Sequence, residues 1–238
     1  MSKTNIVPAL VLATVMMVGS GVSEAGRTGV WTGVDLSPDS WYAYLGAVTA
    51  LSGQDITTQG GWLLRGSVGY GKYDYLAPAV PGGQVDADSR AFDLEVGYAN
   101  FFDKGSVKVY LGADVVHHDD SPDNPTSKVD GTEGGVKGLL EADLNPTDKT
   151  NLGAMGAYST AFDTYWSRFT ASYSFGAFAL GPEVLFMGNE DYDQSRFGAA
   201  ISGINVGVAN VRIYAGHAAS RGRGDDGAYG GISFGGDF

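Results

Sequence analysis

Hydrophobic residues in this chain recur at every second position through segments of about ten residues. The segment 105–117 is an example, in which Val107 and Val109 alternate with small or polar residues. The same period runs through 89–102 and 164–176. Successive side chains of a β-strand point to opposite faces, so a period of two predicts strands with one apolar face. The segments exceed the usual strand of roughly five or six residues and have the length of tilted strands that cross a bilayer.

Twelve such strands are predicted, an even number, as bacterial outer-membrane barrels have. Their expected ranges are 29–36, 41–51, 60–73, 89–102, 105–117, 131–143, 149–160, 164–176, 178–188, 194–206, 210–219 and 228–238. The first segment carries the weakest pattern, so ten strands is the alternative count. The sequence therefore predicts an all-β fold, an antiparallel transmembrane up-and-down β-barrel.

Both ends of the chain favour export to an outer membrane. Residues 1–25 have the features of a secretory signal peptide: Lys3, then an apolar run, then small residues that suit cleavage after Ala25. That apolar run is too short to cross a hydrocarbon core of about 30 Å. Residues 26–238 are then expected to form a single barrel domain. The last segment ends on Phe238, as the final strands of bacterial outer-membrane barrels end on an aromatic residue.

Charged residues inside the predicted strands fall on the face opposite the apolar residues, which would place them in the lumen. They are Asp93, Glu95, Asp114, Glu141, Asp143 and Glu183, and Arg65, Lys108, Lys137, Arg168, Arg196 and Arg212. Acids and bases balance, so we predict an ion-pair network that fills the barrel. A polar pore lining is the alternative, because a barrel of twelve strands lies between packed small barrels and open porins.

The net charge of −12 then falls on loops and turns. The expected turns are short at 103–104, 145–148, 176–177 and 208–209, and at 52–55, whereas the loops 74–88, 118–130 and 220–227 are long. With both termini in the periplasm, the short turns are periplasmic and the long acidic loops extracellular. Outer-membrane lipid and lipopolysaccharide, held through divalent cations, are the expected partners of this rim. Its acids lack the spacing of a defined calcium loop.

Other functions find little support in the residues. The chain has no cysteine, which excludes disulfides, cysteine-based zinc sites and iron–sulfur clusters. Its acidity argues against nucleic acid as a partner. His217, Ser220 and Asp225 would lie near the rim, but their spacing does not provide a base within reach of the serine. His117 and His118 are adjacent and point to opposite faces, which makes them poor joint ligands. We predict no catalytic residue, no metal and no cofactor.

Several segments resemble the cellulose biosynthesis protein S family of proteobacterial outer-membrane proteins. These segments are YLGAVTAL (44–51), GWLLRGS (61–67) with GYGKYDY (69–75), STAFDTYWSR (159–168), LGPEV (180–184), GN (188–189) and DGAYGG (226–231). The resemblance implies an outer-membrane protein associated with cellulose production or export, with cellulose or components of its synthase complex as partners. It brings no catalytic residues.

Aromatic side chains are the residues that would contact a neutral glucan. The candidates are Tyr110, Trp166 and Tyr214, expected in the lumen, and Tyr73, Tyr75 and Tyr192, expected in loops. The alternative is that these residues fill the lumen or belong to the aromatic belts at the membrane interfaces. The leading hypothesis is a non-enzymatic barrel accessory to cellulose biosynthesis, export or surface anchoring. A small diffusion channel is the alternative, followed by a lipid hydrolase at the rim.

Overall fold

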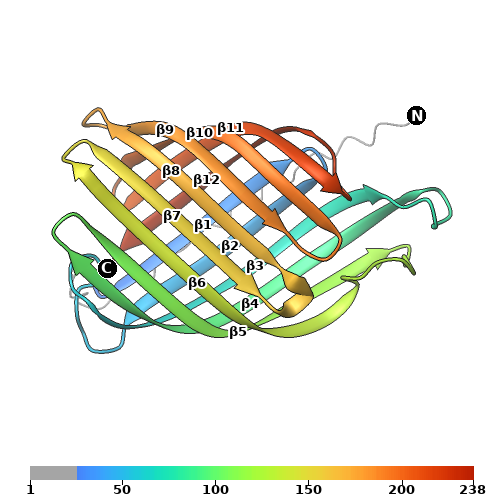
Figure 1. Ribbon diagram of the computed structural model, residues 1–238, viewed down its shortest axis with the longest axis horizontal. Coiled ribbons are helices and arrows are strands. Elements are labelled where there is room, and N and C mark those ends of the chain that lie inside the picture. The colour runs from blue at the N-terminus through green and yellow to red at the C-terminus, as the bar shows by residue number, and fades with distance from the viewer. Residues whose placement is uncertain (1–25) are drawn as a thin grey trace.

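The computed structural model describes residues 26–238, which form one closed barrel of twelve antiparallel strands (Figure 1). The predicted signal peptide, residues 1–25, lies outside the described residues. Each strand pairs with the next along the chain, and β1 pairs with β12 to close the ring. Within residues 26–238 no helix is long and apolar enough to cross a membrane.

The strands are β1 (Thr28–Ser37), β2 (Ser40–Ala50), β3 (Gly61–Leu76), β4 (Gln84–Phe102), β5 (Gly105–Ser121), β6 (Gly131–Thr147), β7 (Thr150–Ser159), β8 (Tyr165–Ser174), β9 (Ala179–Gly188), β10 (Tyr192–Val206), β11 (Ala209–Gly222) and β12 (Gly227–Asp237). A short 3₁₀ helix, η1 (Ala161–Asp163), joins β7 to β8. The predicted fold class and the count of twelve are confirmed.

The two ends of the barrel are built differently. The backbones of Thr28 and Phe238 exchange hydrogen bonds at one end, which we call the terminal end. The opposite end, which we call the distal end, carries the long β3–β4 and β5–β6 hairpins that project beyond their neighbours in Figure 1. Ladder pairing continues there as far as Leu76 with Gln84. Parts of the long loops expected from sequence are therefore strand. Backbone pairing between neighbouring strands continues beyond the segments whose outward-facing residues are apolar.

One connection at the terminal end is longer than expected. The chain between β2 and β3 spans 51–60, whereas only 52–55 was expected as a turn. The other terminal connections remain short, at 103–104, 148–149, 175–178 and 207–208. Residues 56–59 lay outside both the expected turn and the expected strands, and Ile56 among them has no strand period to show that it is buried.

The outward face carries an apolar band between two sets of aromatic residues. Large hydrophobic side chains exposed on this face include Leu45, Val68, Leu94, Leu111, Val136, Leu140, Phe169, Leu180, Phe197, Ile213 and Phe234. Near the terminal end, Trp62 packs edge-on against Tyr98 at 5.4 Å, and on the distal side Trp41 packs against Tyr70 at 5.5 Å. Trp62 and Tyr70 lie eight residues apart on β3, or about 26 Å along a strand. Exposed apolar residues flanked by aromatic girdles mark a barrel that spans a membrane.

Candidate functional site

The lumen holds the polar side chains that the strand alternation directs inward, and they gather in two clusters. The first cluster centres on Arg65 of β3. Its guanidinium Nη1 lies 2.6 Å from Glu95 Oε2 and 3.5 Å from Asp93 Oδ1, and it packs 4.8 Å from the Trp31 ring. Lys137 Nζ of β6 contacts Asp93 Oδ2 at 2.6 Å. Because β6 and β4 are not neighbours in the sheet, this contact crosses part of the lumen.

The second cluster joins β9, β10, β11, β12 and β1. Glu183, only 1 % exposed, forms an ion pair with Arg212 and accepts a 3.0 Å hydrogen bond from the Tyr229 hydroxyl. Arg196 Nη1 lies 2.5 Å from Asp35 Oδ1, and the Tyr214 hydroxyl donates to the other oxygen of Asp35 at 2.9 Å. These contacts link strands two or three places apart, so they brace the barrel from inside.

Eight of the twelve charged residues predicted for the lumen form ion pairs within 4.0 Å, namely Arg65, Asp93, Glu95, Glu141, Lys137, Arg196, Arg212 and Glu183. The other four form no ion pair among the described residues. Asp114 accepts a hydrogen bond from Ser159, Lys108 lies against Phe101, Asp143 is exposed, and Arg168 lies 5.3 Å from the Trp166 ring centroid.

Asp35 is a lumenal acid that the sequence reasoning missed. The alternation of β1 contained the signal, because Val34 and Leu36 lie on the lipid face and leave Asp35 on the lumenal face. Its ion pair with Arg196 joins residues 161 positions apart, which no local pattern reveals.

Loops cover the distal mouth of the barrel. We call the loop 122–130, with Asp191 and Arg223, the distal cap. Arg223 forms an ion pair with Asp191 at 2.8 Å and lies over the Tyr75 ring at 4.7 Å. The Lys128 backbone N–H donates to Asp191 at 3.0 Å, and Asn124 donates to the Tyr75 hydroxyl at 3.1 Å. Three distal connections thus meet over the lumen.

An aromatic residue of η1 packs beneath the distal cap. Phe162 is 5 % exposed, packs with Val116 and Val129, and contacts the His118 ring edge-on at 5.5 Å. Its φ of +52° is unusual for a residue with a side chain and costs conformational energy. Apolar packing in the mouth offsets that cost.

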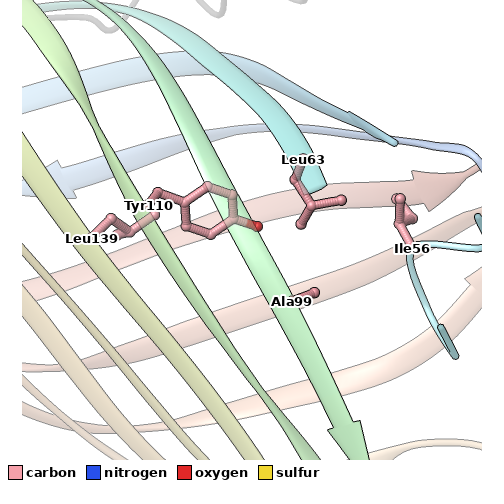
Figure 2. Packing of buried hydrophobic residues seen from close by; sticks show 5 residues of the cluster. All are labelled: Ile56, Leu63, Ala99, Tyr110 and Leu139. Atoms are coloured by element: carbon pink, nitrogen blue, oxygen red, sulfur yellow. The ribbon is translucent and has the colours of Figure 1, made fainter. Parts of the chain in front are cut away.

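A hydrophobic cluster fills one side of the lumen near the terminal end. Ile56, from the long β2–β3 connection, is 3 % exposed and packs with Leu63, Ala99, Tyr110 and Leu139. Figure 2 shows the Tyr110 ring between Leu139 and Leu63, with Ile56 on the other side of Leu63.

The turn that carries Ile56 is fixed by its neighbours. The Thr57 backbone N–H and hydroxyl donate to Asp55 Oδ1 at 2.8 and 2.5 Å, and these bonds hold the pKa of Asp55 below its usual value. The Ile56 backbone N–H donates to the Gly26 carbonyl at 2.6 Å. The loop is therefore held at both flanks while its apolar residue enters the barrel.

Replacing Ile56 with alanine should lower the free energy of unfolding by about 2 kcal/mol, because it leaves a cavity in this cluster. Urea unfolding of the detergent-solubilised protein measures the change. Ser52→Ala, in the same connection but exposed, is the control and should stay within about 0.5 kcal/mol of the wild type. An equal loss in both variants would show that Ile56 does not stabilise the barrel.

The structure distributes the six candidate glucan-contacting aromatics along the lumen. Tyr110, Trp166 and Tyr214 point inward, as expected from their alternation. Tyr73, Tyr75 and Tyr192 were expected in loops, but they lie on β3 and β10. The cause is the extension of the distal strands beyond their apolar segments. Tyr73 and Tyr75 stack at 6.0 Å, and the Tyr75 hydroxyl donates to Asp120 at 2.7 Å.

The histidines are not arranged for hydrolysis. His217 and Ser220 lie on opposite faces of β11, and Ser220 Oγ accepts from Gln194 and donates to the Asp225 carbonyl. His118 contacts the Tyr73 hydroxyl at 3.0 Å inside the mouth, whereas His117 contacts Thr132 outside it. Within residues 26–238, no three His, Asp or Glu side chains gather in a group that could hold a metal ion.

The closed antiparallel barrel and its outward apolar band define the class of transmembrane β-barrel proteins. Its sequence matches the family described as cellulose biosynthesis protein BcsS over residues 30–238, and the chain belongs to this family. Comparison with curated proteins finds no significant sequence match.

The chain is similar to solved barrel structures at low sequence identity. A mutant of TodX, a monoaromatic hydrocarbon channel, is 9 % identical with a TM-score of 0.51, and 89 % of each chain is covered. The β domain of the Bordetella autotransporter BrkA is 14 % identical with a TM-score of 0.49, covering 90 % of this chain and all of that one. The KdgM porin is 9 % identical with a TM-score of 0.47, covering 88 % and 99 %.

Proposed function

We propose that this chain is a non-enzymatic outer-membrane barrel that anchors cellulose or its synthesis machinery at the cell surface rather than conducting the polymer. Membership of the cellulose biosynthesis family supports the link to cellulose. The observation that carries the anchoring role is the filled lumen. The distal cap, the two ion-pair clusters and the Ile56 cluster occupy it in succession. A glucan chain would have to displace the distal cap and lumenal ion pairs.

The distal end is then the extracellular end, and both termini are periplasmic. Acidic residues gather at the distal end, including Asp39, Asp74, Asp86, Asp88, Asp119, Asp123, Glu190, Asp193, Asp225 and Asp226. Lipopolysaccharide phosphates bound through divalent cations would neutralise this rim. Cellulose would contact the outer surface of the distal cap, because Tyr75 beneath it is only 4 % exposed. Tyr73, Tyr75 and Tyr192 become glucan contacts only when the cap opens.

Deletion of the gene tests the proposal. Cellulose yield and the fraction of cellulose attached to cells are measured, and attachment is expected to fall. The wild-type chain should restore it. A variant in which a short Gly-Ser turn replaces 122–130 should reach the outer membrane yet fail to restore attachment. Val208→Gly, in the terminal turn 207–208, is the control and should restore it. Unchanged yield and attachment after deletion would refute the proposal.

A further inference from the structure

A polar cavity lies in the lumen, on the side lined by different strands from those that carry the hydrophobic cluster around Ile56. It has a volume of about 200 Å³ and is lined by β7, β8, β9, β10 and β11. Asn151, Ser172 and Ser202 place it near the terminal end, because each lies close to the end of its strand there. Arg168 and Arg212 provide its cationic wall.

Short side chains explain why this part of the lumen is hollow. The inward positions here carry Thr170, Ser172, Gly181, Ala200 and Ser202. On the opposite wall the corresponding space is filled by large residues such as Tyr110 and Leu139. The result is one apolar, packed side and one polar, open side at the same end of the barrel.

Of the two arginines that line the cavity, Arg168 is the one without a counterion. Among the described residues it makes no ion pair, and its guanidinium carbon lies 5.3 Å from the centroid of the Trp166 ring. The neighbouring carboxylate of Glu183 is already engaged, because Arg212 contacts one oxygen and Tyr229 donates to the other. A charge withdrawn from bulk water is costly unless it is paired. A guanidinium also presents five N–H donors, arranged to bind oxyanions in a bidentate manner.

We propose that this cavity binds a small oxyanion, a carboxylate or a phosphate group, with Arg168 as its principal ligand. Asn151, Thr170, Ser172 and Ser202 supply uncharged hydrogen-bonding groups around it. The cavity has the volume of roughly seven waters in the liquid at about 30 Å³ each, which leaves room for one such group with residual water. The group can belong to a free anion or to an acidic sugar.

Titration of the detergent-solubilised full barrel with inorganic phosphate or with glucuronate, at constant ionic strength, tests the proposal. Isothermal calorimetry measures binding, and tryptophan fluorescence reports on Trp166 beside Arg168. Saturable binding is expected, and Arg168→Gln should weaken it by about tenfold or more, through loss of charged hydrogen bonds. Lys108→Gln removes a lumenal cation outside the cavity and should leave binding unchanged. Trp166→Phe should abolish the fluorescence change but retain the calorimetric signal.

A second variant guards against misfolding as an explanation. Ser172→Phe fills the cavity but retains Arg168, and it should abolish binding while the barrel keeps its heat-modifiable migration on gels. Binding of phosphate alone assigns the site to a free or esterified phosphate, and binding of glucuronate alone assigns it to an acidic sugar. Absence of saturable binding in the wild type, or equal binding in wild type and Arg168→Gln, would overturn the proposal.

Discussion

Replacing Glu183 with alanine is expected to lower the free energy of unfolding of the barrel by about 3–5 kcal/mol, the range seen when one partner of a buried ion pair is removed. Glu183 is 1 % exposed and is contacted by both Arg212 and Tyr229. Its loss leaves the Arg212 guanidinium in the lumen without a counterion, a short distance from the unpaired Arg168. It also leaves the Tyr229 hydroxyl without an acceptor.

Urea unfolding in detergent micelles, followed by tryptophan fluorescence, measures this effect. Glu190→Ala removes the same kind of charge from an exposed distal connection and should change stability by less than about 0.5 kcal/mol. The double variant Glu183→Ala with Arg212→Met should recover most of the loss, because removing both partners of a buried pair is far less costly than removing one. Equal losses for Glu183→Ala and Glu190→Ala would show that the lumenal ion pair does not brace the barrel.

The strands and their faces could be predicted because neighbouring residues of a strand alternate between lipid, which favours apolar side chains, and the lumen, which accepts polar and charged ones. A charge such as Arg65 or Glu95 is costly in the bilayer, so it marks the inner face of its strand. The apolar alternation therefore determined the number of strands and the direction of their side chains. It failed at the distal end of β3 and β4, since backbone pairing continues where the lipid no longer requires apolar residues.

The contacts that close the lumen could not be predicted in this way. The pairing of Arg196 with Asp35 joins β10 to β1, which are distant in sequence and lie three places apart only because the barrel closes. Ile56 and Phe162 belong to connections, where a single apolar residue has no period to indicate that it will be buried. The cavity beside Arg168 depends on the sum of small residues on several strands, each unremarkable by itself.

The intact barrel is expected to carry no steady ion current in a planar lipid bilayer. A lumen of twelve strands is wide enough to conduct only when side chains do not fill it, because eight-stranded barrels are packed and barrels of 16–18 strands are open. Here the distal cap covers one mouth, and the pair of Arg196 with Asp35 crosses the lumen below it. A steady current through the wild-type protein would contradict the anchoring role and favour the diffusion channel.

Opening the barrel should require two changes together. The first replaces 122–130 by a Gly-Ser turn, with Arg223→Ser, and removes the distal cap. The second is the pair Arg196→Ala and Asp35→Ala, which removes both partners of the lumenal contact. Either change alone should give no steady current across the bilayer. The combination should conduct, because the open path then continues into the polar cavity and avoids the packed side around Ile56. That path passes Arg168, so the current should favour anions, and adding Arg168→Gln should reduce the preference measured from the reversal potential in a salt gradient.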